Sequence, residues 1–105
     1  RALAVTTATR SDALPDVPAL SEFLPGFEAS YWVGFGAPKN TRVQFIDLLN
    51  TQINAAIAEP AIRTRLVDFG GVPQGGSPSD FGRLIEGETE KWAKVIKFAK
   101  LSVSN

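Results

Sequence analysis

The order of apolar and polar residues along the chain predicts two short strands in its first third and three helices after them. Residues 1–7 form a short apolar run with β-favouring residues, which indicates a buried strand. Residues 27–35 are rich in aromatic and β-branched residues and alternate imperfectly, as expected of a strand whose neighbours change along its length. Between them, three prolines predict that residues 8–26 form an irregular excursion.

The first predicted helix follows a cap at Asn40 or Thr41 and is the most regular amphipathic segment of the chain. Its apolar residues recur at steps of three and four, so they share one face of a helix. These residues are Val43, Ile46, Leu49, Ile53, Ala56 and Ile57.

Two further helices are marked by their end signals. Pro60 pre-sets the start of a short helix over residues 61–69, which the pair Gly70-Gly71 should end. Ser77 followed three residues later by Asp80 has the pattern of a capping box, with Asp in place of Glu. The helix that begins there should run to about Ala99.

Composition removes several classes of function. The chain has 105 residues, 11 basic and 11 acidic side chains and therefore no net charge. Because these charges are interspersed, the chain has no basic patch that could bind the phosphates of a nucleic acid. Nucleic acid is therefore not expected as a partner. The chain contains no cysteine and no histidine, which excludes disulfides, Cys and His metal ligands and His-based catalytic triads. We therefore expect neither an enzyme nor a cofactor, and no apolar run is long enough to span a membrane.

The first third of the sequence carries a series of specific motifs. Arg1 to Pro18 reads RALAVTTATRSDALPDVP, and it is followed by Leu24-Pro-Gly-Phe-Glu28 and by Trp32-Val-Gly34. This series resembles the receptors of tripartite tricarboxylate transporters, over the last third of such a receptor. Asp12 departs from the pattern, because proline is usual at that position.

The resemblance implies an α/β fold, namely the C-terminal portion of a two-lobed type II periplasmic binding protein. By that analogy residues 1–26 end the second lobe, residues 27–33 form a strand that crosses the hinge, and residues 34–105 complete the first lobe. Arg1 lies directly before a predicted strand, so we interpret it as a cut end rather than a native start.

The resemblance also implies a ligand, a small carboxylate, and a partner, the permease of a tripartite tricarboxylate-type transporter. In this family backbone amides and hydroxyls at strand-to-helix turns hold carboxylate oxygens, and most of these turns precede the segment that corresponds to this chain. Among the residues present, Thr6 and Thr7 are the candidates to line the ligand cleft. The alternative is that their hydroxyls only cap the end of the first strand.

Other conspicuous side chains have two interpretations each. Arg10 could bind a carboxylate through its guanidinium fork, or it could pair with Asp12 or Asp16 and pin the excursion. Trp32 could stack on a ligand or pack at the hinge. Trp92 lies on the apolar face of the last predicted helix and is expected in the core.

Three acidic residues at alternate positions, Glu86, Glu88 and Glu90, invite an acid/base or metal hypothesis. On a helix, alternate residues point about 200° apart, so their carboxylates cannot converge on one site. A solvated helix face is the simpler interpretation.

Two functional hypotheses follow. The first is a part of a periplasmic receptor that captures a small carboxylate and delivers it to the permease. The second is a truncated relative without binding activity that associates with itself as a homodimer or with another chain, because a lobe divided in this way exposes apolar surface and unpaired strand edges.

Overall fold

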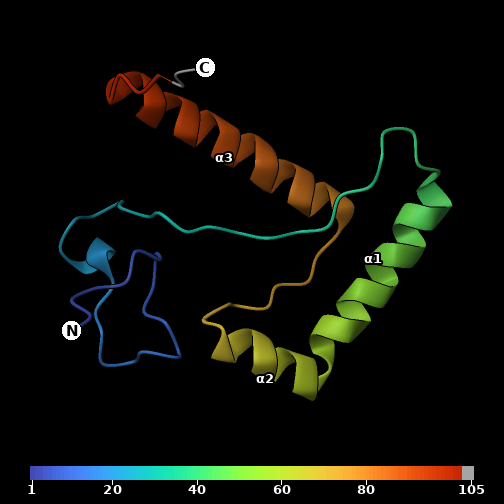
Figure 1. Cartoon of the computed structure of the whole chain (residues 1–105), viewed down its shortest axis with the longest axis horizontal. Coiled ribbons are helices and arrows are strands. Elements are labelled where there is room, and N and C mark those ends of the chain that lie inside the picture. Colours follow the sequence, from blue (N-terminus) through green and yellow to red (C-terminus); the bar gives the residue numbers. More distant parts are fainter. Residues whose placement is uncertain (103–105) are drawn as a thin grey trace. The chain divides into compact units, whose positions relative to one another are not determined.

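A computed structural model describes residues 1–102 of the chain (Figure 1). Its helices are the 3-10 turn η1 (Leu20–Glu22) and the α-helices α1 (Val43–Ala58), α2 (Pro60–Asp68) and α3 (Pro78–Phe98). The three α-helices predicted from the sequence are thus confirmed, each to within a residue or two at its ends.

The boundary between α1 and α2 and the end of α2 are set by local backbone chemistry. Pro60 is the first residue of α2, where its missing N–H removes no helical hydrogen bond. Gly70 has a φ of 79°, a left-handed conformation that glycine adopts without steric cost. It donates its N–H to the carbonyl of Val67 at 2.8 Å, while Gly71 donates to Leu66 at 2.9 Å. These two bonds form a complete Schellman motif, the predicted stop signal.

The start of α3 is the predicted capping box. The Ser77 hydroxyl accepts the N–H of Asp80 at 3.1 Å, and the Asp80 carboxylate accepts the N–H of Ser77 at 2.8 Å. The helix ends in a second Schellman motif, in which Leu101 donates to Ile96 at 3.1 Å and Lys100 to Lys97 at 3.3 Å. Lys100 occupies the left-handed position with a φ of 52°, where a side chain is strained.

The two strands predicted for residues 1–7 and 27–35 are not formed in this structure. Within residues 1–102 there is no strand, and the only β-type pairing is an isolated parallel bridge between Val5 and Ala19. A strand is stabilised by a row of hydrogen bonds to the backbone of its neighbours. Residues 1–7 have two such bonds at Val5, and residues 27–35 contact residues 1–7 through one bond, from Ala29 to the carbonyl of Thr6. High β-propensity alone therefore leaves both segments irregular.

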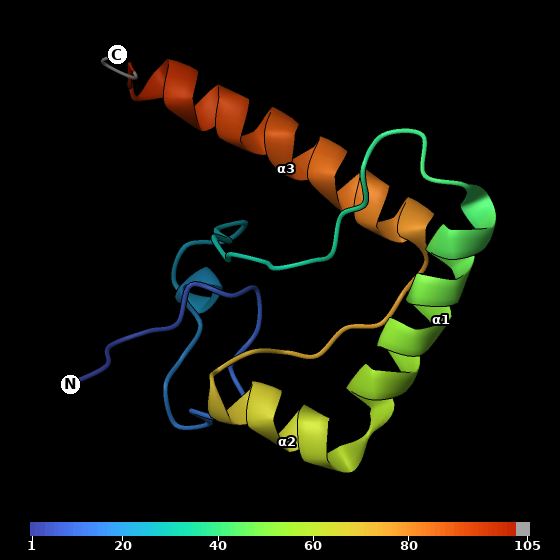
Figure 2. The ribbon, with the colours of Figure 1, turned by 45° about the vertical axis from the view of Figure 1, so that its right-hand side comes forward.

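The chain divides into two compact units. The first unit consists of residues 1–36 with residues 55–74, and it contains η1 and α2 (Figures 1 and 2). The second unit consists of residues 37–54 with the described residues from 75 onward, and it contains most of α1 together with α3. In the second unit Asn54 of α1 accepts the N–H of Gly76 at 3.0 Å and donates to its carbonyl at 2.9 Å, which ties α1 to the segment before α3.

Apolar burial is slight throughout the described residues. Ala19 is the single apolar side chain there that is fully buried. All three α-helices expose large apolar side chains, among them Phe45 on α1, Leu66 on α2 and Ile96 on α3. Burial of apolar side chains is the main stabilising term in folding. A partner that covered these exposed side chains would therefore stabilise the chain.

Candidate functional site

The first residues of the chain are held against the proline-rich excursion by backbone hydrogen bonds. Val5 donates to the carbonyl of Pro18 at 2.9 Å, and Leu20 donates to the carbonyl of Val5 at 2.8 Å. Between these bonds lies Ala19, which is 1% exposed. The excursion is therefore ordered by this contact, and the residues after Val5 emerge from a defined point.

Thr6 and Thr7 lie directly after this anchor. The carbonyl of Thr6 accepts the N–H of Ala29 at 2.9 Å. The segment is therefore also bonded to the residues that follow the excursion. The Thr6 residue is exposed, whereas Thr7 is half-buried and its hydroxyl donates to the carbonyl of Thr9 at 2.7 Å. The Thr7 hydroxyl thus stabilises a local turn, and its oxygen still has a lone pair to accept a further bond.

Arg10 pairs with Glu22, at the end of η1, and not with the predicted Asp12 or Asp16. The guanidinium Nε and Nη2 donate to the two carboxylate oxygens, both at 2.8 Å, and Nη1 donates to the carbonyl of Pro15 at 3.3 Å. The prediction of a structural pair is therefore confirmed and its partner is corrected. The guanidinium fork is engaged within the protein, which argues against Arg10 as a ligand fork.

The same pairing determines the charge state of Glu22. Hydrogen bonding from Arg10 and, to a smaller extent, from the N–H of Ala19 lowers the pKa of the Glu22 carboxyl to about 2. The hydrogen bond with Glu22 also raises the pKa of Arg10 above its usual value. Both groups are ionised at every physiological pH, so the pair acts as a fixed clamp across the excursion.

Sequence reasoning missed Glu22 because it considered only acids close to Arg10 in the chain. The signal that could have identified Glu22 is its position three residues after Ala19, which is the spacing of a capping box. Glu22 is the third residue of η1, and its carboxylate accepts the N–H of Ala19 at 2.9 Å in the manner of a capping box. This bond places the carboxylate opposite Arg10.

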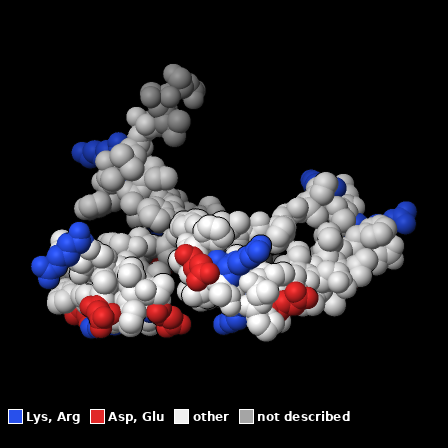
Figure 3. All heavy atoms as spheres, turned by 60° about the horizontal axis from the view of Figure 1, so that its bottom comes forward, with Lys and Arg blue, Asp and Glu red and all other residues white. Residues whose placement is uncertain are grey.

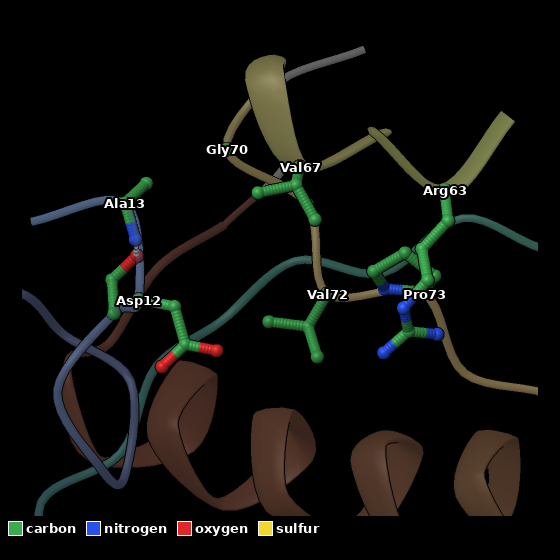
Figure 4. A pocket seen from close by; sticks show the side chains of 9 residues that line it. Asp12, Ala13, Arg63, Val67, Gly70, Val72 and Pro73 are labelled. Atoms are coloured by element: carbon green, nitrogen blue, oxygen red, sulfur yellow. Dashed lines mark hydrogen bonds between the residues drawn. The ribbon is translucent and has the colours of Figure 1, made fainter. Parts of the chain in front are cut away.

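A shallow pocket of about 50 Å³ lies in the first unit, between the excursion and the end of α2 (Figure 4). Asp12 and Ala13 stand on one side of it, and Val67, Val72 and Arg63 line the other. The pocket therefore has an apolar floor between a carboxylate and a guanidinium. It is too small for most ligands and includes neither Thr6 nor Thr7.

On α3 the acidic residues behave differently from one another. Glu88 is not solvated as predicted, because its side chain is 16% exposed and accepts hydrogen bonds from Trp92 Nε1 at 2.8 Å and Lys91 Nζ at 3.3 Å. Lys91 Nζ also lies 5.8 Å from the centre of the Trp92 ring. Trp92, expected in the core, is 41% exposed in this chain. The i,i+4 spacing of Glu88 and Trp92 was the missed signal.

Side chains for a metal site and helices for a membrane span are both lacking among residues 1–102. No group of three or more acidic side chains that could hold a metal ion is found there. Acidic and basic side chains are mixed on the face shown in Figure 3, without a patch of one sign. No helix in the described part is long and apolar enough to cross a membrane.

Comparison with known proteins gives a consistent set of relatives. The family model described as "Tripartite tricarboxylate transporter family receptor" matches residues 1–101. The chain is 41% identical over 99% of its length to the UPF0065 protein of the tcbD–tcbE intergenic region of Pseudomonas sp. strain P51, and it covers 32% of that protein.

Two further relatives extend this result. The UPF0065 protein of the clcB–clcD intergenic region of Pseudomonas knackmussii is 32% identical over 99% of the chain, which covers 63% of that protein. Protein BugT of Bordetella pertussis is 36% identical over 92% of the chain, which covers 30% of that protein. The chain thus spans from about a third to under two thirds of the length of these curated relatives.

Proposed function

We propose that this chain, which belongs to the tripartite tricarboxylate transporter receptor family, forms part of a receptor that binds a small carboxylate outside the cytoplasm and delivers it to a membrane permease. The observation that carries the proposal is the family match over residues 1–101. Members of the family are receptors and not enzymes, which agrees with the lack of histidine and cysteine in the chain. The periplasm is the compartment that this function requires.

The proposed fold of the whole receptor is the two-lobed α/β architecture of periplasmic binding proteins. In it residues 1–26 end the second lobe, residues 27–33 cross the hinge, and residues 34–105 complete the first lobe. Two features of the chain support this proposal. The β-prone segments 1–7 and 27–35 form few backbone hydrogen bonds in the described chain, so a sheet could pair more of their backbone, and the helices have exposed apolar side chains that a sheet would cover.

Thr6 and Thr7 are the residues of this chain that we propose to line the ligand cleft. Thr6 is exposed, and both residues follow directly on the Val5 anchor, so their position is well defined. A hydroxyl that donates to a carboxylate is worth more than a hydrogen bond between neutral groups. Replacing Thr6 with valine in a complete receptor should therefore weaken carboxylate binding by about 10-fold or more. Thr64→Val on α2, whose hydroxyl bonds the carbonyl of Pro60, is the matched control.

The receptor proposal is tested by grafting this chain into the relative from Pseudomonas sp. strain P51 in place of the matching segment. Thermal unfolding of the chimera and of the relative is then followed with a panel of mono-, di- and tricarboxylates. Because a ligand that binds only the folded state raises its stability, at least one acid should raise the Tm of both proteins saturably. A folded chimera that responds to no acid, beside a relative that does, contradicts the proposal.

A second candidate function is self-association of the chain as it stands. Within residues 1–102 every α-helix exposes apolar side chains and Ala19 alone is a buried one, which favours this candidate. Light scattering distinguishes the two, since a clean monomer at high concentration argues against self-association.

A further inference from the structure

The turn η1 and the residues just before it contact both ends of one short loop of the first unit. Residues 6–9, which we call the threonine loop, form neither helix nor strand in the described chain. At the start of the loop, Val5 donates to the carbonyl of Pro18 at 2.9 Å and accepts the N–H of Leu20 at 2.8 Å. These backbone bonds fix the point at which the loop begins.

Two side chains of η1 hold the far end of the threonine loop. The Ser21 hydroxyl donates to the carbonyl of Ala8 at 2.8 Å. The Glu22 carboxylate accepts two bonds from the guanidinium of Arg10, both at 2.8 Å. The N–H of Ala19 donates to the same carboxylate at 2.9 Å, so the carboxylate is itself held in place. The far end of the loop is therefore tied to the same turn as its start.

Between these fixed ends the loop has two further bonds. The Thr7 hydroxyl donates to the carbonyl of Thr9 at 2.7 Å, and the Thr6 carbonyl accepts the N–H of Ala29 at 2.9 Å. Each such contact removes conformational freedom from the loop before a ligand arrives. A loop that is already ordered binds more tightly than a mobile one, because the cost of ordering it is not charged to binding.

The contacts of η1 bear on the position of the loop more than on the stability of the whole chain. The side chains of Arg10 and Glu22 are 49% and 40% exposed, and exposed ion pairs stabilise a fold little. A bidentate guanidinium–carboxylate pair nevertheless has a defined geometry, so it fixes the orientation of the segment that carries it. Its loss should therefore loosen the loop locally without unfolding the chain.

We propose that Ser21 and Glu22 are positioning residues for carboxylate binding, which hold the far end of the threonine loop so that Thr6 and Thr7 meet the ligand in one fixed arrangement. In this role both residues act through the loop rather than on the ligand. The inference rests on the proposed receptor function and on the two threonines as ligand residues. It adds that the affinity for the ligand depends on a turn more than ten positions further along the chain.

The first test follows the loop in the 105-residue chain without any ligand. The N–H of Ala29 reports on the loop, because its acceptor is the Thr6 carbonyl. In hydrogen exchange by NMR this amide should be protected in the parent, and at least about five-fold less protected in the double variant Ser21→Ala/Glu22→Gln. Glu88→Gln, which alters an ion pair of α3, is the matched control and should leave the protection unchanged. An amide that is unprotected in the parent, or equally protected in the double variant, overturns the proposal.

The second test measures affinity in the grafted receptor, by calorimetry with the acid that gives the largest thermal shift. Ser21→Ala and Glu22→Gln should each weaken binding at least about three-fold, and the double variant at least about ten-fold, whereas Glu88→Gln keeps the parental affinity. Ser21→Thr keeps the hydroxyl and should bind like the parent. Circular dichroism confirms that every variant is folded at the assay temperature, so a lower affinity does not reflect unfolding.

The two tests separate this inference from the receptor function. Lower protection of Ala29 together with lower affinity supports the positioning role. Unchanged affinity in a double variant whose Ala29 amide has lost protection overturns it, because the loop then moves without effect on the ligand. A parent chimera that binds no acid contradicts the receptor function and with it the role in binding, whereas the exchange result still shows whether η1 holds the loop.

Discussion

Replacing Asn54 with alanine is expected to release the segment that leads into α3. The Asn54 side chain forms two hydrogen bonds with Gly76, at 2.9 and 3.0 Å, and a third with the side chain of Asn50 at 3.2 Å. A protein hydrogen bond contributes about 0.5–1.5 kcal/mol net, and the lower end applies where water can replace the lost partner. Alanine recovers up to about 0.7 kcal/mol through its higher helix propensity. The expected net loss of stability is therefore about 1 kcal/mol.

Asn50→Ala is the matched control for this prediction. Asn50 also donates to the carbonyl of Gly76, at 2.8 Å, but only Asn54 accepts the N–H of Gly76. Both substitutions make the same change in helix propensity on α1. The two variants therefore differ in whether the Gly76 N–H keeps its partner.

Hydrogen exchange followed by NMR measures this difference at the Gly76 amide itself. The amide should be protected in the parent chain and in Asn50→Ala, and about five-fold or more less protected in Asn54→Ala, the factor that corresponds to 1 kcal/mol. Equal loss of protection in both variants, or an amide that is unprotected in the parent chain, would refute the reasoning.

The other predictions concern the ends of the helices and the clamp. Gly70 and Lys100 both occupy the left-handed position of a Schellman motif. Gly70→Ala should therefore lower the free energy of unfolding and Lys100→Gly should raise it, each by about 1 kcal/mol in thermal unfolding. A change in the same direction for both variants would contradict this. Ser77→Ala should cost about 1 kcal/mol through loss of the cap on α3. The clamp stabilises the chain above the ordinary glutamate pKa of 4.5, and this contribution should vanish as pH falls towards about 2, the pKa of Glu22 in the fold. Glu22→Gln should remove that acid-limb dependence, as followed by circular dichroism.

The helices were predictable because their signals are local. Pro60 and Gly70 bound α2 through their own backbone preferences, and Ser77 and Asp80 bond to each other across one turn. Such interactions depend on residues a few positions apart, so they form in this chain whatever surrounds it. The apolar residues of α1 recur at helical spacing, and this local pattern likewise predicted where the helix lies in the sequence.

The strands and the clamp were not predictable in the same way. A strand requires a row of hydrogen bonds to a neighbouring backbone, and residues 27–35 have the propensity but form one such bond, from Ala29 to Thr6. Arg10 has acidic residues two and six positions away, yet it pairs with Glu22, because η1 and the Val5–Ala19 bridge bring that carboxylate closer. Both cases depend on contacts between distant parts of the chain, which periodicity does not encode.

Recognition of a carboxylate is the central claim of this account, and calorimetry of the grafted receptor tests it most directly. The acid that gives the largest thermal shift is titrated into the chimera, and the amide of the same acid serves as the control. The account predicts saturable binding of the acid, at least about 10-fold weaker binding of the amide, and no binding of either to the 105-residue chain alone. Equal affinity for acid and amide, or saturable binding of the acid by the chain alone, would contradict it.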